Sequence, residues 1–277
     1  MKIYYEILNH FLYISNVWKK NRPLENFVST NVFNIDICLD CKYDNQIIYD
    51  KKNLSSIYGL QYSLMDESKY MFFSENDPRH VLYTEKEDYS EWHLSLREDC
   101  SDETFMELLM AGFYSYISLK EALLMHASAI SYKECGIVFT APSGTGKTTQ
   151  AELWQKYRNA VILNGDKVFL KQETDGIHAW GSPWKGSSSY AENISVPLKA
   201  IVVLEQAEEN SIRKLNGLEM LEKVIPNIFL PQWDMKCENA VLNFLNQVLQ
   251  KIDIYLLQCC PDEDAVALVE ETLFKIS

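Results

Sequence analysis

One short glycine-containing stretch has the residue types and spacing for phosphate chemistry. It reads Ala141-Pro142-Ser143-Gly144-Thr145-Gly146-Lys147-Thr148 and fits the phosphate-binding loop, or Walker A pattern, with Ala in place of the usual first Gly. Gly144 and Gly146 allow the backbone to bend so that successive N–H groups point inward at phosphate oxygens. We expect Lys147 on the β- and γ-phosphates of ATP, or of another nucleoside triphosphate, and the Thr148 hydroxyl on Mg²⁺. The predicted nucleotide-binding residues are Ser143, Gly144, Thr145, Gly146, Lys147, Thr148 and Thr149.

The residues around this stretch predict the elements that must position it. The apolar run 136–140 predicts a strand, and 149–154 predicts a helix whose positive dipole end faces the loop. Strand, glycine loop and helix in this order are the context that the motif needs. The alternative is an ordinary strand–turn–helix with a chance Gly-Lys-Thr.

Two further residues are candidates for the chemistry. The apolar run 160–164 predicts a strand that ends at Gly165-Asp166, where a magnesium ligand or catalytic base belongs; an ordinary turn carboxylate is the alternative. His126 lies in the middle of a predicted buried strand, 122–132. It is either a neutral core histidine or a residue facing the γ-phosphate, and spacing alone favours the core.

A loop rich in glycine and serine, 181–190, is the candidate substrate element. It carries one large aromatic residue, Trp184, and one cation, Lys185, and such loops beside a nucleotide site often hold substrate. Lys185 and Arg213 could each supply a second cation to the γ-phosphate or the substrate. The alternative is a surface linker.

Composition limits the remaining functions. The 277 residues carry a formal net charge of −13, which argues against nucleic acid as a partner. No apolar run approaches the ~20 residues of a membrane span, and no signal peptide is recognisable. Seven cysteines without a framework spacing predict a cytoplasmic protein, and Cys38-x-x-Cys41 lacks the further ligands of a zinc site.

The pattern predicts an α+β or α/β fold in two domains. Residues 1–98 should form a mostly antiparallel β domain of unknown role, and 99–277 a nucleotide-binding domain with a mixed sheet flanked by helices. Strands in the first domain are expected at 2–8, 31–38, 46–49, 56–64, 69–73, 80–83 and 91–96. In the second domain we expect helices at 104–120, 238–252 and after Pro261, a 167–172/177–181 hairpin, and strands at 198–206 and 254–260.

The order of His126, the glycine loop and Gly165-Asp166 resembles the C-terminal domain of HPr kinase/phosphorylase. The fold of that domain is similar to the ATP-dependent phosphoenolpyruvate carboxykinases. The resemblance covers residues 120–275 and implies that His126 lies in the active site. That family usually has two consecutive acids at the strand end, and here Gly165 replaces the first. Asp166 is therefore expected to act both as metal ligand and as base, or His126 takes the role of base.

The run Gly181-Ser182-Pro183-Trp184-Lys185-Gly186 resembles more closely the HPr-kinase-like proteins encoded with bacterial peptide-modification genes. Some of those proteins phosphorylate a serine of a lasso-peptide precursor. The resemblance implies transfer of the γ-phosphate of ATP to a hydroxyl, on a serine of a peptide or protein, and a homo-oligomer is possible. The HPr-recognition signature is missing, so HPr is a poor substrate.

Two alternative functions stay open on the sequence. One is a phosphoenolpyruvate-carboxykinase-like enzyme that acts on a small carboxylate, although arginine is scarce after the loop. The other is a non-catalytic ATP-binding sensor or interaction protein that lost turnover together with the second acid.

Overall fold

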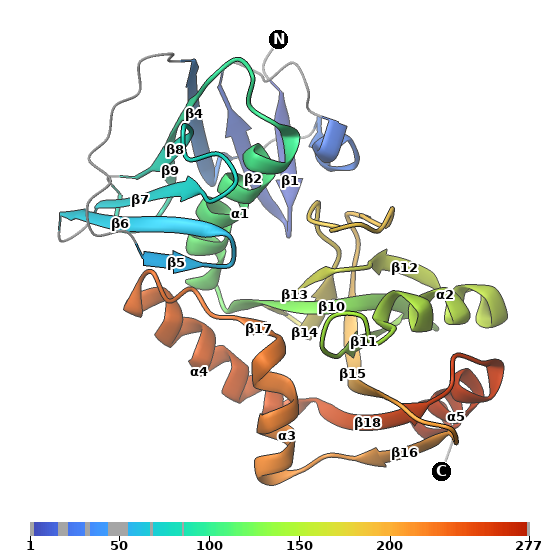
Figure 1. The fold of residues 1–277 in the computed structure, drawn as a ribbon. Coiled ribbons are helices and arrows are strands. Elements are labelled where there is room, and N and C mark those ends of the chain that lie inside the picture. The colour runs from blue at the N-terminus through green and yellow to red at the C-terminus, as the bar shows by residue number, and fades with distance from the viewer. Residues whose placement is uncertain are drawn as a thin grey trace. The chain divides into compact units, whose positions relative to one another are not determined.

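A computed structural model describes residues 3–15, 22–30, 34–43, 55–66, 69–84 and 86–275 (Figure 1). The chain forms two compact units. The first consists of Met1–Lys120 with Pro231–Ala240, and the second of Glu121–Leu230 with Val241–Ser277. The chain has a mixed α/β architecture with one large mixed sheet in each unit.

The first unit extends beyond the domain boundary expected after residue 98 because it includes helix α1 (Asp102–Ser118). This helix packs on the sheet of the first unit, and a Cβ added at Gly112 would meet side-chain atoms of Leu82 and Trp92 at 3.2 Å. Ser101 caps the helix, and its hydroxyl accepts a hydrogen bond from the Thr104 N–H. The helix therefore belongs to the core of the first unit.

The sheet of the first unit has nine strands within the described residues, in the order β3-β1-β2-β4-β9-β8-β7-β6-β5. The strands are β1 (Tyr4–Ile7), β2 (His10–Ile14), β3 (Val28–Ser29), β4 (Ile37–Tyr43), β5 (Ser55–Ile57), β6 (Leu60–Asp66), β7 (Lys69–Ser74), β8 (Val81–Tyr83) and β9 (Glu91–Leu96), with a 3₁₀ helix at Arg22–Phe27. The sheet is mostly antiparallel, as expected, but β4 runs parallel to both β2 and β9. The expected strand 46–49 lies outside the described residues, and β2 and β3 were not predicted.

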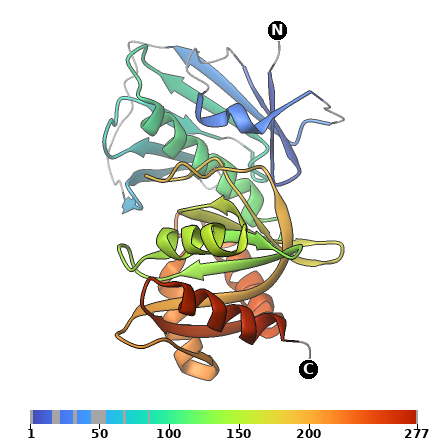
Figure 2. The same ribbon diagram turned by 90° about the vertical axis from the view of Figure 1, so that its right-hand side faces the viewer.

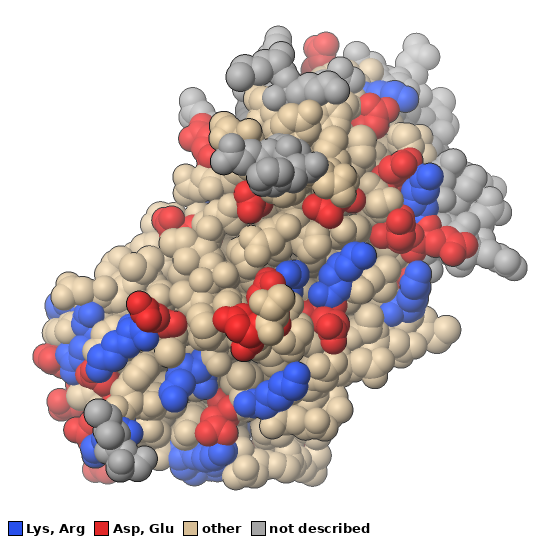
Figure 3. Space-filling model, turned by 180° about the vertical axis from the view of Figure 1, so that it is seen from behind, with Lys and Arg blue, Asp and Glu red and all other residues tan. Residues whose placement is uncertain are grey.

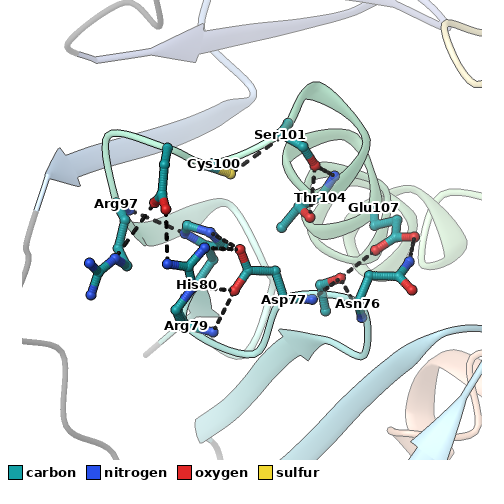
Figure 4. Close-up of polar contacts among 11 residues, drawn as sticks. Asn76, Asp77, Arg79, His80, Arg97, Cys100, Ser101, Thr104 and Glu107 are labelled. Carbon is teal, nitrogen blue, oxygen red and sulfur yellow. Dashed lines mark hydrogen bonds and ion pairs between the residues drawn. The ribbon is translucent and has the colours of Figure 1, made fainter.

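A network of polar contacts in the first unit surrounds the fully buried His80 (Figure 4). The His80 Nδ1 accepts a hydrogen bond from the Arg97 N–H at 3.2 Å, which leaves the ring proton on Nε2, 3.0 Å from Asp77 Oδ2. Burial lowers the pKa of His80, while a hydrogen bond from Arg79 helps to hold the pKa of Asp77 well below its usual range. The network fixes the β7–β8 turn, and Glu107 of α1 joins it through Asn76.

The second unit holds a sheet whose main path runs β11-β10-β13-β14-β15-β18-β16, with β12 and β17 also paired to β10. Its strands are β10 (Ala122–Tyr132), β11 (Cys135–Thr140), β12 (Val161–Asn164), β13 (Lys167–Glu173), β14 (Gly176–Trp180), β15 (Ser195–Gln206), β16 (Ser211–Lys214), β17 (Ile228–Phe229) and β18 (Asp253–Cys259). Its helices are α2 (Lys147–Arg158), α3 (Gly217–Val224), the 3₁₀ helix Ile225–Asn227, α5 (Glu263–Phe274) and the part of α4 (Met235–Lys251) from Val241 onward.

Strand β10 connects two parts of this sheet, and the change occurs at His126. Residues Ala122–His126 pair with β13, whereas Ala127–Tyr132 pair with β11 on one edge and partly with β12 on the other. The glycine loop starts at the end of β11, and Asp166 lies in the turn between β12 and β13. Both segments therefore flank His126 and Ala127 of β10. The long strand β15 also changes partners, from antiparallel β14 to parallel β11 and β18.

Helices cover both faces of this sheet. Figures 1 and 2 show α2 and α5 on one side and α3 and α4 on the other. The core under α2 and α5 includes Phe139, Trp154, Val202 and Val269, all fully buried. Because both faces are covered, β11 and the second half of β15 read as continuous apolar runs.

The end of α2 is tied to α5 by a cluster around Glu270. Its carboxylate accepts hydrogen bonds from Tyr132 of β10, Lys133 and Arg158 of α2, and the last of these contacts is 2.6 Å long. These hydrogen bonds, that of Tyr132 first, lower the pKa of Glu270 to about 2. The cluster therefore fixes the helix that follows the glycine loop.

We expect Glu270→Gln to lower the free energy of unfolding by about 1 kcal/mol at pH 7, because charge-assisted hydrogen bonds are lost. A carboxylate with a lowered pKa in the folded state stabilises the protein above its unfolded pKa of about 4.3 and loses that effect as the pH falls towards 2. Urea unfolding should therefore show that the free energy of unfolding of Glu270→Gln differs less from that of the wild type at pH 3 than at pH 7. Glu271→Gln, which removes an exposed pair with Lys275, is the matched control and should have less than half the effect. If the difference in the free energy of unfolding were the same at both pH values, the stabilising role of the ionised Glu270 carboxylate would be contradicted.

No helix in the described part of the chain is long and apolar enough to cross a membrane. Figure 3 shows one face of the molecule, where basic and acidic side chains are interspersed.

Candidate active site

The glycine loop joins β11 to α2, as the sequence predicts. Gly144 and Gly146 have φ angles of +80° and +113°, which side chains disfavour, and a Cβ added at Gly144 would meet no atom within 4 Å. Helix α2 begins at Lys147, and no side chain caps its first turn. By contrast, Ser101 caps α1 and Asp262 caps α5 through side-chain oxygens. The amides at the start of α2 are therefore not occupied by a capping side chain, and the loop leaves open space beside them.

The Lys147 side chain lies folded across the start of the loop. It is only 6% exposed, and its ammonium donates to the carbonyl oxygens of Ala141 (3.0 Å) and Pro142 (3.3 Å). Burial lowers the pKa of Lys147, and the charge of Asp166 opposes this shift. The cation is thus held inside the loop by main-chain acceptors rather than by an acid.

Thr148 links α2 to the strand-end acid. Its hydroxyl donates to the Gly165 carbonyl at 3.0 Å, one residue before Asp166. From the other side, the buried Ser128 of β10 donates its hydroxyl to the Lys147 carbonyl at 2.7 Å. These bonds bring the first turn of α2 against both β10 and the β12–β13 turn.

Both carboxylate oxygens of Asp166 have a cationic or potentially cationic neighbour. Oδ1 lies 3.3 Å from His126 Nε2, and Oδ2 lies 2.7 Å from Lys167 Nζ. Burial raises the pKa of Asp166, but the hydrogen bonds with His126 and Lys167 outweigh this effect and hold it well below its usual range. Fully buried Asn164 sets the turn, because its Oδ1 accepts from the N–H groups of both Asp166 and Lys167 at 2.8 Å. Asp166 is therefore an ionised carboxylate in a fixed position.

The glycine–serine loop lies directly against this carboxylate. Asn164 Nδ2 donates to the Ser182 carbonyl at 2.8 Å, which attaches the loop to the turn. Gly186 has φ +56°, and a Cβ added there would lie 2.7 Å from Asp166 Oδ2. Trp184 is 6% exposed and its ring packs on Phe169, whereas Lys185 is exposed. The sequence predicted a substrate element or, alternatively, a surface linker, and the structure buries the tryptophan of this loop. Whether Trp184 or Lys185 contacts a substrate stays a prediction.

The close contact at Gly186 leads to a prediction. Gly186→Ala should displace the Asp166 carboxylate and lower any activity that depends on it by about tenfold or more, since a shift of ~1 Å can cost that much. The control is Gly217→Ala, whose φ of +58° is nearly the same but whose Cβ would meet no atom within 4 Å. Both variants place alanine at a similar positive φ, and thermal unfolding identifies the folded preparations, whereas only Gly186→Ala should lose activity. Equal activities would contradict a role for this contact.

Arg213 does not join these groups in the structure. It lies on β16, and its guanidinium is exposed and binds both carboxylate oxygens of Glu219 on α3. The structure instead brings two lysines to the site that the sequence analysis did not single out. Lys167 binds Asp166, and Lys223 of α3 pairs with Glu205 of β15. The position of Lys167 next to Asp166 in the chain was a visible signal, whereas nothing in the sequence indicated Lys223.

Two cavities flank the glycine loop at the carboxyl ends of the parallel strands β11, β15 and β18. A cavity of about 560 Å³ lies between the loop, Glu205 and Lys223. A second cavity, of about 410 Å³, lies between the loop, the first turn of α2 and Cys259-Cys260-Pro261. In open α/β sheets, ligands bind outside the carboxyl ends of the strands, and these volumes are in the range of ligand sites.

The residues at the loop are of the kind that hold Mg²⁺. Magnesium prefers oxygen ligands and is usually bound through one or two carboxylates plus substrate phosphates. Here the Thr148 hydroxyl donates to the Gly165 carbonyl, and the Asp166 carboxylate belongs to the next residue of the chain. Within the described residues, no group of three or more His, Cys, Asp or Glu side chains is arranged as a metal site. Magnesium and nucleotide binding at this site stay predictions.

Comparison with known families identifies the chain. The family described as SynChlorMet cassette protein ScmC matches residues 97–259, more than half of the sequence. The chain belongs to the ScmC family. The match covers the glycine loop, His126, Asp166 and the first cavity, and it ends at Cys259, before Cys260 and Pro261 of the second cavity. It stops short of α5 and leaves most of the first unit unmatched.

Among solved structures, this ScmC-family chain is similar to the HPr(Ser) kinase/phosphatase from Coxiella burnetii. The match has 11% sequence identity and a TM-score of 0.34, and it covers 54% of this chain and 95% of that one. A comparison with curated protein sequences returns no match.

Proposed function

We propose that this protein is a magnesium- and ATP-dependent kinase that transfers the γ-phosphoryl group to a serine hydroxyl of a peptide. The observation that carries the proposal is the link from Thr148 through the Gly165 carbonyl to Asp166. It joins the first turn of an uncapped helix to an ionised carboxylate, with His126 3.3 Å from that carboxylate. Phosphoryl transfer requires such a combination, because positioning and electrostatic stabilisation supply most of the rate.

The loop residues would act on the nucleotide. The amides of Ser143–Thr149 would donate to phosphate oxygens, and the Lys147 ammonium would turn from the Ala141 and Pro142 carbonyls to the β- and γ-phosphates. Thr148 and Asp166 would hold Mg²⁺, which when bound neutralises charge on the phosphate oxygens. Burial of Lys147 strengthens its interaction with an incoming anion, since little water screens the charge.

Asp166 and His126 would act on the acceptor. An ionised carboxylate beside an imidazole can orient a hydroxyl and take its proton on a carboxylate oxygen of Asp166. For His126 to take the proton on Nε2 instead, its contact with Asp166 would have to open and Nε2 would have to be the unprotonated ring nitrogen. The loose transition state of phosphoryl transfer places little demand on base strength, so the lowered pKa of Asp166 is compatible with this role. The loop around Gly186 would exclude water from the carboxylate.

A peptide as acceptor is supported by the sequence resemblance to kinases encoded with peptide-modification genes. Membership of a family described as a cassette protein agrees with a function shared with other products of a gene cassette. The acceptor hydroxyl would enter beside Asp166, and the cavity between the loop and Lys223 provides room next to the phosphates.

The test is incubation of the protein with ATP, Mg²⁺ and pools of serine-containing peptides, including the short peptides encoded beside its gene. Mass spectrometry should find a peptide that gains one phosphate on serine, in wild type but not in a sample without Mg²⁺. ATP binding without any phosphorylated peptide would favour a nucleotide sensor. Loss of ATP that depends on oxaloacetate would favour an enzyme acting on a small carboxylate.

A further inference from the structure

The Lys167 side chain forms an ion pair with the Asp166 carboxylate, which the proposed function assigns as a ligand of a metal ion. Its ammonium lies 2.7 Å from Asp166 Oδ2, while His126 Nε2 faces the other oxygen at 3.3 Å. The three side chains are between 22% and 30% exposed, so water screens the contacts only in part. Both oxygens of the Asp166 carboxylate are therefore paired with side chains of this protein.

The sheet fixes the base of this lysine side chain. Lys167 is the first residue of β13 and lies directly opposite His126 in the β10–β13 ladder. Its N–H donates to Asn164 Oδ1 at 2.8 Å, and its carbonyl accepts from the Ser182 hydroxyl at 2.7 Å. The ammonium also lies 5.9 Å from the centroid of the Phe229 ring. The pairing with β10 and these two backbone hydrogen bonds thus fix the position of the Lys167 backbone beside Asp166.

Two cations compete for one acid in this arrangement. Asp166 and Lys167 together carry no net charge, and a divalent cation that binds Asp166 must either displace the ammonium or lie beside it. A nucleoside triphosphate brings about four negative charges, which can hold both the metal and the displaced ammonium. Metal alone offers no such compensation.

We propose that Lys167 is the counter-ion that closes Asp166 to metal in the free protein, so that metal binds there only together with the nucleotide. This inference rests on the proposed function, because it assumes that Asp166 is the metal ligand. It makes Lys167 a positioning residue: it acts through Asp166 and releases it when the phosphates arrive. A purely structural lysine would contribute to stability without any influence on metal affinity.

The test measures binding of Mn²⁺, as a substitute for Mg²⁺, by calorimetry without nucleotide. Wild type should bind Mn²⁺ weakly, whereas Lys167→Met should bind it at least about tenfold more tightly, because Oδ2 of Asp166 loses its positively charged neighbour while His126 still faces Oδ1. Lys167→Gln should behave like Lys167→Met, and Lys167→Arg, which keeps the charge, like the wild type. The control is Lys171→Met on the same strand, which frees Glu173 from a contact of the same 2.7 Å length and should not create the tighter site.

Thermal unfolding identifies which variants are folded, and Lys167→Gln replaces Lys167→Met if the latter is not. Equal Mn²⁺ affinities of wild type and the folded neutral variant would overturn the inference. Failure of the wild type to bind ATP with Mn²⁺ would instead overturn the proposed function. The two outcomes come from separate titrations and are therefore distinguishable.

Discussion

Lys147→Met is expected to abolish phosphoryl transfer, with a loss of at least about 100-fold, as for the removal of one preorganised donor from a water-poor site. Methionine fills the space of a side chain that is 6% exposed, but it cannot neutralise charge on the β- and γ-phosphates. The folded protein should remain, because the variant loses a buried cation and only the two hydrogen bonds to the Ala141 and Pro142 carbonyls. Transfer of radiolabelled phosphate and thermal unfolding, measured on the same preparation, check both expectations.

The matched control for this variant is Lys156→Met. Lys156 lies on the same helix, is exposed, and contacts Tyr157 rather than the loop. Lys156→Met changes the net charge by the same amount as Lys147→Met. It should leave transfer within about twofold, because the exposed charge of Lys156 lies near the other end of α2 from the glycine loop and is screened by salt. If Lys147→Met retained wild-type transfer, the assignment of the glycine loop to phosphate binding would be wrong.

Asp166→Asn should reduce transfer by about 100-fold or more, for a different reason. Asparagine keeps the shape of the side chain but removes the negative charge that would hold Mg²⁺ and orient the acceptor. It also leaves His126 and Lys167 without their shared anion. The fall should appear in kcat as well as in the apparent affinity for Mg²⁺, because the same carboxylate serves both steps.

An aspartate–histidine pair elsewhere in the second unit provides the control for that variant. Asp175 Oδ1 lies 2.9 Å from His178 Nε2 in the β13–β14 hairpin, and Asp175 is 64% exposed. Asp175→Asn should leave transfer unchanged, so loss of an aspartate–histidine contact is not itself sufficient. Wild-type transfer by Asp166→Asn would discard the proposed mechanism, whatever the control shows.

The sequence predicted those parts of the site that depend on local patterns. The glycine loop, its strand and its helix follow from residues within about 20 positions of one another, and the structure has them in the predicted order. The strand 122–132 was predicted with its correct ends because its apolar run is bounded by turn residues. For His126, spacing alone favoured the core, whereas the family resemblance implied a place in the active site. The structure places its Nε2 3.3 Å from Asp166 Oδ1, and a role in the active site stays a prediction.

Features that depend on contacts between distant segments could not be predicted in this way. The parallel pairing of β4 with β2 and β9 depends on how the chain returns across the sheet, which no local pattern records. Trp184 was expected in a substrate element or a surface linker, but its ring packs on Phe169, 15 residues earlier in the chain. Lys223 pairs with Glu205, 18 residues away, on a short helix that was not predicted.

Calorimetric titration of the wild-type protein with ATP and Mg²⁺ tests the central claim most directly. The account predicts saturable binding of one nucleotide per chain, which Lys147→Met removes. Absence of any binding heat from the folded wild-type protein would contradict the account, because every proposed step requires the loop to hold the phosphates.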